Sequence, residues 1–313
     1  MRTCVIGGGG FIGRHVADAL IATGRDVLVL GRRAERPSGL PRQVGYRCCD
    51  AGDRAVLRAV LDGCGEIVYL AHASVPKVAV ADPAREMHDN LAPLLNLLEE
   101  AQELPSLRKL LITSSGGTVY GIAGELPITE SHPTSPISSY GITKLAIERY
   151  TLMYHLTKRL PSTVVRPANA YGTGQRPFTG QGFIATAMGM VLKRQPVTIF
   201  GTNDTVRDYI HVRDVASGLV AALTHGLDGE IYNIGTSVGR SNTDVLDEIR
   251  IIAESSGLVV EVRRVEPRDI DVPVNVLSYE KILGHTGWRP REPFEAGLSE
   301  MWDELNSFLG YHE

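Results

Sequence analysis

The sequence predicts an α/β fold, in which a doubly wound parallel sheet is followed by a smaller, mixed α/β C-terminal domain. Two observations lead to this prediction. Short β-branched runs alternate with helical patterns through the first half of the chain, which is typical of a parallel sheet with helices on both faces. Residues able to bind ligands follow these runs directly, at the strand ends where such sheets form their sites.

The first expected strand, residues 3–6, leads into a glycine-rich loop and a helix over residues 14–23. Glycines at positions 7, 10 and 13 allow a tight turn, a close approach of backbone to a pyrophosphate, and close packing of helix on strand. The helix N-terminus then faces the phosphates. We therefore expect a Rossmann-like dinucleotide site, with cofactor contacts from Gly7, Gly10, Phe11, Ile12 and Gly13.

The second expected strand, residues 26–30, ends without an acidic residue. NAD-selective sites place a carboxylate at this position to bind the ribose hydroxyls. Here the chain reads Gly31-Arg32-Arg33, and two cations favour a 2′-phosphate. Arg32 and Arg33 are therefore predicted cofactor contacts that leave NADP open beside NAD. The alternative is that Arg32 stacks on the adenine or faces solvent.

The third and fourth expected strands, residues 44–49 and 66–70, also end in candidate cofactor contacts. Asp50, with Ala51 beside it, could hold the adenine amino group, or Asp50 could cap the helix expected over residues 54–61. After the fourth strand, the small side chains of Ala71 and Ala73 would let a dinucleotide pass close to the backbone. We expect His72, between them, to make local hydrogen bonds.

A helix is expected over residues 83–103, where Pro93 must kink or break it. The fifth strand, residues 109–113, runs into Ser114 and Ser115, with Ser114 a predicted cofactor contact. A second long helix covers residues 139–159, and the sixth strand, residues 164–165, is closed by Arg166-Pro167-Ala168-Asn169.

Tyr140 and Lys144 stand one turn apart on the second of these helices, so they share a face. An ammonium beside a phenol favours the phenolate, and a Tyr with a lowered pKa can act as a general base near neutral pH. The alternative is an amphipathic helix that carries both residues without using them.

The chain resembles the extended short-chain dehydrogenase/reductase family over nearly its whole length, and within it the nucleotide-sugar 4-epimerases. The motifs that carry the resemblance are Gly7-x-x-Gly10-x-x-Gly13, Thr118-Val119-Tyr120-Gly121, Tyr140-x-x-x-Lys144, Arg166-Pro167-Ala168-Asn169, Phe200-Gly201, Arg207-Asp208-Tyr209-Ile210-His211-Val212, Tyr232-Asn233-Ile234-Gly235 and Arg268-x-x-Asp271-Val272.

The resemblance implies a role for several of these residues. Tyr140 would be the base or acid at the sugar C4 hydroxyl, and Lys144 would bind the nicotinamide ribose and lower the Tyr140 pKa. Asn90 would help to hold the cofactor, and Pro167 would border the nicotinamide. The expected substrate contacts, to the diphosphate or to the nucleotide and sugar, are Gly116, Thr118, Asn169, Gln181, Phe200, Arg207, Tyr209 and Arg268.

One position departs from the family pattern. The Ser or Thr expected three residues before Val-Tyr-Gly is Gly116 here. Side chains two apart on a strand share a face, so Thr118 is the favoured source of the hydroxyl, with Ser115 as the other candidate. Family members that dehydrate or decarboxylate the sugar carry a carboxylate in this interval, where this chain has Gly117 and Thr118. The absence of that second acid/base group argues against elimination.

The leading hypothesis is a 4-epimerase that forms a transient 4-keto sugar with tightly bound NAD or NADP. The sequences of the motifs around Thr118 and Tyr140 are similar to those of enzymes that interconvert dTDP-L-rhamnose and dTDP-6-deoxy-L-talose in the synthesis of surface polysaccharide. The nearest rival substrate pair is UDP-glucose and UDP-galactose. Two other hypotheses are a nucleotide-sugar reductase with exchangeable NADP, which the pair Arg32 and Arg33 suggests, and a non-catalytic dinucleotide sensor.

We expect residues 1–168 to form the dinucleotide-binding domain, with 212–235 packing back on it, and residues 169–313 to bind the substrate. Arg207-Asp208-Tyr209 is expected at an exposed cleft edge. The apolar faces of helices 84–103 and 140–159 suggest a homodimer, unless they pack internally. A net charge of −4 and the absence of a signal run or a metal-binding Cys/His pattern suggest a cytoplasmic protein with no metal, membrane or nucleic-acid partner.

Overall fold

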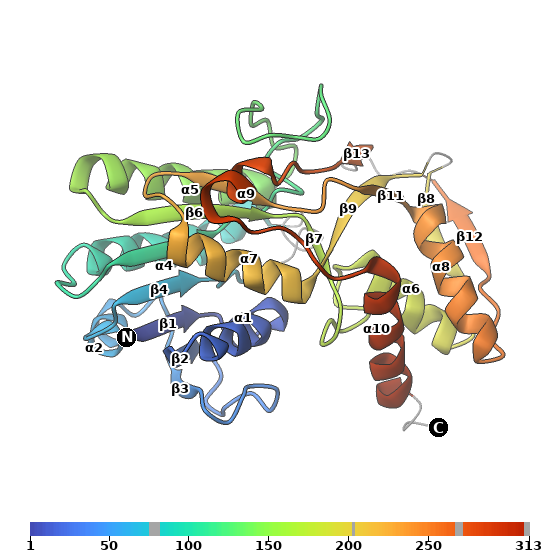
Figure 1. The fold of residues 1–313 in the computed structure, drawn as a ribbon, viewed down its shortest axis with the longest axis horizontal. Helices are drawn as coiled ribbons and strands as arrows, with labels where there is room; N and C mark the ends of the chain where they lie inside the picture. The colour runs from blue at the N-terminus through green and yellow to red at the C-terminus, as the bar shows by residue number, and fades with distance from the viewer. Residues whose placement is uncertain (75–81, 202–203, 267–271, 310–313) are drawn as a thin grey trace.

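Parallel strands form the central sheet of the computed structural model, which describes residues 1–74, 82–201, 204–266 and 272–309. The strands are β1 (Arg2–Ile6), β2 (Asp26–Gly31), β3 (Gly45–Cys48), β4 (Glu66–Tyr69), β5 (Lys109–Thr113), β6 (Ser162–Pro167) and β10 (Ile231–Ile234). Among the described residues they make a seven-stranded sheet in the order β10-β6-β5-β4-β1-β2-β3 (Figure 1), and every neighbouring pair is parallel. The predicted doubly wound sheet is confirmed.

Helices cover both faces of this sheet. One face carries α1 (Phe11–Ala22) and α7 (Val212–His225), and the other carries α2 (Arg54–Leu61), α4 (Pro83–Ala101) and α5 (Ser139–Lys158). Successive strand residues point to opposite faces. In β1, Val5 therefore lies in the core with α1 and α7, while Cys4 and Ile6 lie in the core with α2, α4 and α5. Burial on both faces explains why the strands read as continuous apolar runs.

Helix α4 is not broken at Pro93, which lies inside one continuous helix. A proline in a helix interior removes one backbone hydrogen bond. The buried side chains of Leu94, Leu97 and Leu98 pack against the sheet just beyond it. That burial offsets the lost bond, which is why the break, one of the two outcomes expected at Pro93, does not occur.

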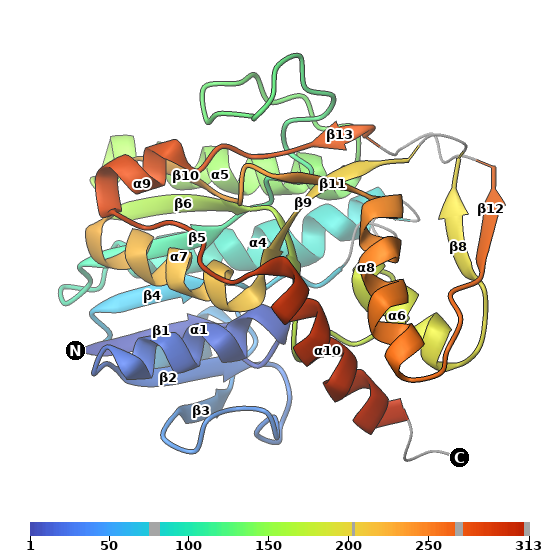
Figure 2. The same cartoon turned by 45° about the vertical axis from the view of Figure 1, so that its right-hand side comes forward.

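The remaining strands and helices form a smaller unit beside the sheet (Figure 2). Its strands are β7 (Asn169–Tyr171), β8 (Val197–Phe200), β9 (Val206–His211), β11 (Gly239–Ser241), β12 (Val262–Val265) and β13 (Val274–Asn275). Strand β9 lies at its centre, paired with β7, β11 and β13. Its helices are α6 (Phe183–Leu192), α8 (Asn242–Ser255) and α10 (Phe294–Leu309), which share one apolar core.

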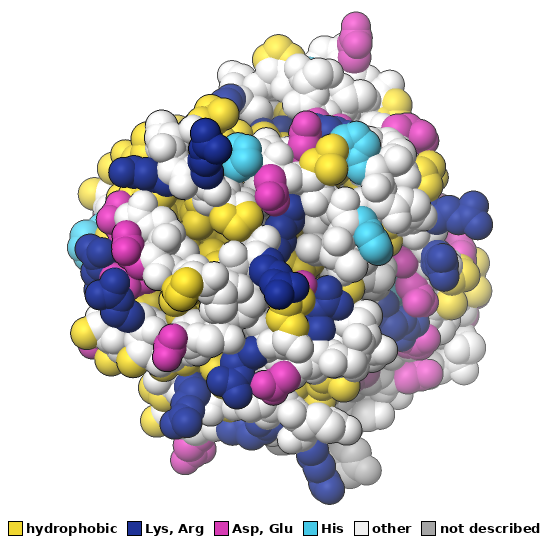
Figure 3. Space-filling model, turned by 60° about the vertical axis from the view of Figure 1, so that its left-hand side comes forward, with side chains coloured by type: hydrophobic (Ala, Val, Ile, Leu, Met, Phe, Trp, Pro, Cys, Tyr) yellow, Lys and Arg dark blue, Asp and Glu magenta, His cyan; other side chains and the backbone are white. Residues whose placement is uncertain are grey.

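Segments of the second half of the chain return to the large sheet. Strand β10 forms its edge beside β6, α7 packs against α1, and α9 (Glu280–Thr286) lies beside α7. The chain therefore crosses between the two units several times, and the division at residue 168 stays a prediction. Side chains of both charges are interspersed with hydrophobic ones on the face drawn in Figure 3. In the described ranges, no helix is both long and apolar enough to cross a bilayer.

Candidate active site

The glycine loop lies at the carboxyl end of β1. Gly7 has a φ of 82°, and a Cβ atom there would lie 2.7 Å from the backbone nitrogen of Ala71. At Gly13, a Cβ atom would lie 2.4 Å from the Cα of Gly8. Gly10 is the N-cap of α1, and no side chain caps this helix. The first backbone N–H groups of α1, at Phe11 and Ile12, are thus left open to an anion. The loop fits a dinucleotide pyrophosphate.

The next two strand ends carry the residues predicted for the adenosine half. Arg32 and Arg33 follow β2 and are exposed, and Tyr46 donates a hydrogen bond to the Arg33 carbonyl at 2.6 Å. Asp50 is exposed, and its carboxylate accepts from the Gly52 amide at 2.9 Å. Asp50 does not cap the following helix as the alternative proposed. Asp53 is the cap, because its carboxylate accepts from the first amides of α2.

Tyr140 and Lys144 lie buried in the first turns of α5, which Ser138 caps. The Lys144 Nζ is 5.8 Å from the Tyr140 ring centroid and donates to the Thr113 carbonyl at 3.1 Å. Burial lowers the Lys144 pKa to about 8, although Glu86 and Glu148 raise it. Burial also raises the Tyr140 pKa. The expected lowering of that pKa by Lys144 is not found, because burial disfavours the phenolate more than its surroundings favour it.

Ser115 supplies the hydroxyl that interacts with the Tyr140 phenol, and this interaction lowers the Tyr140 pKa against burial. Residues 116 and 118 do not share a strand face as expected, because residues 116–118 form a turn after β5, with the Val119 amide bonded to the Ser115 carbonyl at 3.2 Å. The Thr118 Oγ1 is buried without a partner among the described residues. At Gly116, a Cβ atom would lie 2.3 Å from Leu277 Cδ1, so a Ser or Thr there would require Leu277 to move.

A second buried cluster lies beside Tyr140, at the end of β4. His72 Nε2 is 2.9 Å from the Glu86 carboxylate, and the His72 ring lies edge-on to the Tyr140 ring with centroids 4.6 Å apart. Asn90 accepts from the Ala73 amide at 2.6 Å. Asn90 thus holds the backbone that the predicted cofactor contacts Ala71 and Ala73 belong to. No sequence motif pointed to Glu86, since one acidic residue in a helical pattern usually faces solvent.

A buried network behind α5 explains several of the sequence motifs. Arg166 donates to both oxygens of Glu148, at 2.8 and 2.6 Å, and to the Tyr120 hydroxyl at 2.7 Å. Tyr120 in turn donates to Asn233 at 2.7 Å. The Ser114 hydroxyl, predicted to contact the cofactor, also donates to Glu148. These bonds join α5, β5, β6 and β10, and so fix the helix that carries Tyr140 and Lys144.

Unpartnered polar atoms surround the turn at Gly116. Pro167 closes β6, and its carbonyl accepts from the Gly116 amide at 2.9 Å. Asn169 Nδ2 is buried without a partner in the described structure. Asn275 donates to the Gly116 carbonyl at 3.1 Å, and its Oδ1 is also unpartnered. No motif pointed to Asn275. Buried polar atoms left open in this way are available to a ligand.

Asp208 and the predicted substrate contact Tyr209 do not lie at the expected exposed cleft edge. Asp208 is fully buried and accepts from the Thr236 amide and hydroxyl, at 3.0 and 2.6 Å. Tyr209 is 6% exposed, and its ring packs near Phe294. The expected cleft edge is wrong because β9 lies inside a sheet, with strands on both sides. Arg207 is partly exposed, Phe200 ends β8, and Gln181 is exposed. Arg268 lies outside the described residues.

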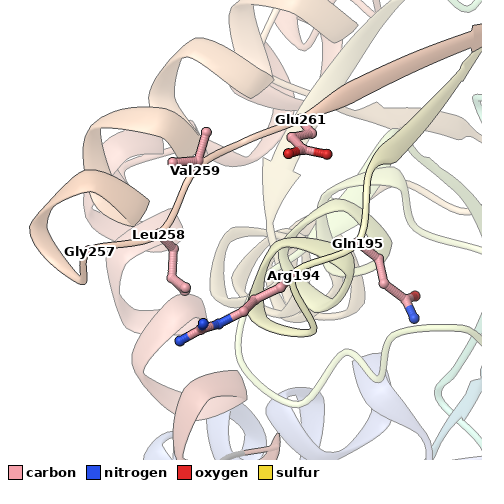
Figure 4. A pocket seen from close by; sticks show the side chains of 6 residues that line it. All are labelled: Arg194, Gln195, Gly257, Leu258, Val259 and Glu261. Carbon is pink, nitrogen blue, oxygen red and sulfur yellow. The ribbon is translucent and has the colours of Figure 1, made fainter.

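Two cavities lie in the smaller unit, away from the residues around Tyr140. One of about 200 Å³ lies between the turns after α6 and α8 (Figure 4). It is lined by Arg194, Gln195, Gly257, Leu258, Val259 and Glu261. The other, of about 340 Å³, is lined in part by Tyr171, Tyr209, Arg240 and Phe294. Only Tyr209 among these was a predicted site residue, so neither cavity is the candidate active site.

The glycine loop and three strand ends, with Ala71, Ser115 and Pro167, thus meet at one edge of the sheet, where α5 places Tyr140. Comparisons with known proteins bear on that arrangement. A family model described as the NAD dependent epimerase/dehydratase family matches residues 3–235. The UDP-glucose 4-epimerase of Mycolicibacterium smegmatis is 30% identical over 307 residues, which are 96% of this chain and 97% of that protein.

Two solved structures are similar over nearly their whole length. The UDP-glucose 4-epimerase of Thermotoga maritima, with UDP-glucose, superposes with a TM-score of 0.92 at 31% identity, covering 99% of this chain and 100% of that one. The UDP-glucose 4-epimerase of Thermus thermophilus, in complex with NAD, has a TM-score of 0.88 at 34% identity, and the match covers 97% of this chain and 99% of that one.

Proposed function

The chain belongs to the NAD dependent epimerase/dehydratase family, and from this premise we propose that it is a nucleotide-sugar 4-epimerase with tightly bound NAD. Membership confirms the family expected from the sequence. One observation carries the proposal: the Tyr140 phenol lies buried beside Lys144 and in contact with the Ser115 hydroxyl, at the sheet edge that holds the glycine loop. This is the arrangement needed to move a proton at a hydroxyl during hydride transfer.

The proposed mechanism uses few groups of the chain. Bound NAD would supply the chemistry of accepting a hydride from the sugar C4 and returning it. Tyr140 would take the proton of the C4 hydroxyl and, after the 4-keto sugar turns so that the other face of C4 receives the hydride, would give the proton back to the C4 oxygen. Ser115 would hold the same hydroxyl by a hydrogen bond. Lys144, fixed by the Thr113 carbonyl, would bind the nicotinamide ribose.

The finer identity of the substrate is part of the proposal. UDP-glucose and UDP-galactose have the better support, since relatives over the whole chain carry the name UDP-glucose 4-epimerase. The open polar atoms of Asn169 and Asn275 also suit a sugar with a full set of hydroxyls. The pair dTDP-L-rhamnose and dTDP-6-deoxy-L-talose is the second candidate, supported by the amino-acid sequences of the motifs around Thr118 and Tyr140.

The test is turnover without added dinucleotide. Purified protein is denatured, and the released dinucleotide is identified by mass spectrometry. Native protein is then incubated with UDP-glucose and, separately, with dTDP-L-rhamnose, and the products are followed by NMR. The proposal expects one 4-epimer from one of the substrates and no net consumption of NADPH. Stoichiometric NADPH consumption would instead select the reductase hypothesis, and Tyr140→Phe with near wild-type turnover would contradict the mechanism.

A homodimer is also part of the proposal. Ile142, Met153 and Leu156 are 56%, 43% and 79% exposed on α5, and their spacing places them on one side of the helix. Met87 of α4 is 53% exposed. A second copy would bury these side chains in a helical bundle. Light scattering should give twice the chain mass for the wild type and the single mass for Met153→Glu/Leu156→Glu. A monomeric wild type would contradict it.

A further inference from the structure

His72 and Glu86 form a buried pair beside Tyr140 to which the mechanism above gives no role. The His72 side chain is 8% exposed and that of Glu86 is 1% exposed. Their closest atoms, His72 Nε2 and Glu86 Oε1, are 2.9 Å apart. The imidazole ring lies against the phenol ring of Tyr140 at an interplanar angle of 71°. The pair therefore touches the residue proposed to move the proton.

The hydrogen bond fixes which nitrogen of His72 carries the proton. A carboxylate only accepts hydrogen bonds, so Nε2 must carry the hydrogen that Glu86 receives. Burial, together with Lys144, lowers the His72 pKa to about 2, so the ring is neutral. Nδ1 then has a free lone pair. This atom is buried and has no donor among the described residues, and an acceptor left open inside a protein calls for an explanation.

The surroundings hold this orientation firmly. The second oxygen of Glu86 accepts from the Ser74 hydroxyl, and the Glu86 carbonyl accepts from Asn90 Nδ2 at 2.8 Å. Asn90 also accepts from the Ala73 amide. The loop that carries His72 is thus tied to α4 at three points. A hydrogen-bonded carboxylate that orients a histidine ring is the usual way to present its other nitrogen to a ligand.

We propose that His72 is a ligand-binding residue of this active site, whose Nδ1 accepts a hydrogen bond from a hydroxyl or amide group of a bound ligand. Glu86 is a positioning residue that maintains the required tautomer. The donor is either a group of the dinucleotide, on its ribose or carboxamide, or a hydroxyl of the sugar. The proposal rests on the proposed function for the identity of these ligands.

Two substitutions of His72 distinguish the effect of its hydrogen-bond acceptor, Nδ1, from the effect of its ring shape. His72→Asn places an amide oxygen near the position of Nδ1, whereas His72→Phe keeps a ring against Tyr140 without an acceptor. The matched control is His88→Asn on α4, where the side chain is 82% exposed. Thermal unfolding of each variant shows whether it folds. Binding of NAD to the stripped protein and binding of UDP-glucose to the NAD-loaded protein are then measured by titration calorimetry.

We expect His72→Phe to raise the dissociation constant of one of the two ligands by about tenfold or more. His72→Asn should keep the dissociation constant of that ligand within about threefold of wild type. A weaker NAD titration places the donor on the dinucleotide, and a weaker UDP-glucose titration places it on the sugar. If both dissociation constants in folded His72→Phe stay within twofold of wild type, the proposal is wrong. A wild type that binds NAD but no UDP-glucose refutes the proposed substrate instead, and the NAD titration alone then decides for or against His72.

A spectroscopic measurement tests the role of Glu86 separately. Nitrogen-15 shifts of histidine distinguish the two neutral tautomers and the imidazolium. The wild type should show His72 neutral and protonated at Nε2 down to about pH 5. In Glu86→Gln the amide can donate as well as accept, so the two tautomers should mix. An unmixed Nε2 tautomer in that variant would contradict the positioning role, and an imidazolium in the wild type would contradict the free acceptor.

Discussion

The Ser115 hydroxyl meets the Tyr140 phenol, while the Thr118 hydroxyl next along the turn is buried without a partner in the described structure. Leu277, from the other end of the chain, fills the space where a side chain at position 116 would stand. The hydroxyl therefore reaches Tyr140 from the residue before the turn. The two hydroxyls, of which the sequence favoured Thr118, thus have different expected effects when they are removed.

Ser115→Ala should lower kcat for 4-epimerisation on the order of 10²-fold, because it removes a hydrogen bond to the group that changes charge in the transition state. Thr118→Val, which has the same shape as the wild type, should leave kcat within about threefold. Both values are measured at saturating substrate with the bound dinucleotide quantified in each variant. Equal losses in kcat for the two variants would contradict the assignment of Ser115.

Glu86→Gln should move the acidic limb of the pH profile of kcat/KM to lower pH. The Tyr140 pKa is raised by burial and, in the same direction, by the charge of Glu86. Removal of that charge makes the phenolate easier to form, so the base is available at lower pH. Lys144 also faces Glu86, and the loss of the charge lowers the Lys144 pKa as well. The control is Glu103→Gln, at an exposed position. A limb that stays in place or moves to higher pH would contradict the prediction.

Much of the sheet could be predicted because its elements carry local signals. The helix over residues 54–61 was expected at its observed bounds, and the Asp53 carboxylate caps its start. The glycine loop likewise needs only the order strand, loop, helix. Tyr140 and Lys144 were found because their spacing is that of one helical turn.

The errors have a common physical cause, which is partners from distant parts of the chain. Strand β9 reads Val-Arg-Asp-Tyr-Ile-His, a pattern typical of a surface segment, but its Asp208 is buried because Thr236 and Leu277 donate to it. Glu86 is buried because His72 and Ser74 close over it. No local pattern shows that such partners exist, so Asp208 was expected at an exposed edge and Glu86 was not singled out.

Charge reversal of Arg32 and Arg33, at the end of β2, should show whether the protein binds the 2′-phosphate that distinguishes NADP from NAD. Arg32 and Arg33 are exposed there, where no carboxylate is present to bind a ribose hydroxyl. Arg32→Glu/Arg33→Glu should weaken 2′,5′-ADP at least tenfold more than 5′-ADP, since only the first carries the 2′-phosphate. Calorimetric titration of both nucleotides into stripped protein measures this. The exposed Arg42→Glu is the control, and equal losses for the two nucleotides would show that the pair does not face the ribose.

Asp208 should make the apoprotein less stable as the pH rises through the range from about 4 to 6. Burial raises its pKa from 3.8 to about 6, although bonds from Thr236 and Leu277 oppose the shift. Between these two values the folded chain holds a proton on Asp208 that the unfolded chain has lost. Stability from this residue is therefore full below pH 3.8 and is lost as the pH passes 6, by about 3 kcal/mol in total.

The measurement is urea unfolding of the wild type and of Asp208→Asn between pH 4 and pH 7. Asparagine does not titrate, and the hydrogen bonds that it loses cost the same at every pH in this range. The free energy of unfolding of the wild type minus that of the variant should therefore fall by about 2 kcal/mol from pH 4 to pH 7, since part of the total effect already lies below pH 4. Asp303→Asn, at an exposed position of α10, is the matched control. A difference that rises over this range would mean that Asp208 is stabilised as a carboxylate, and that its bonds to Thr236 and Leu277 outweigh its burial.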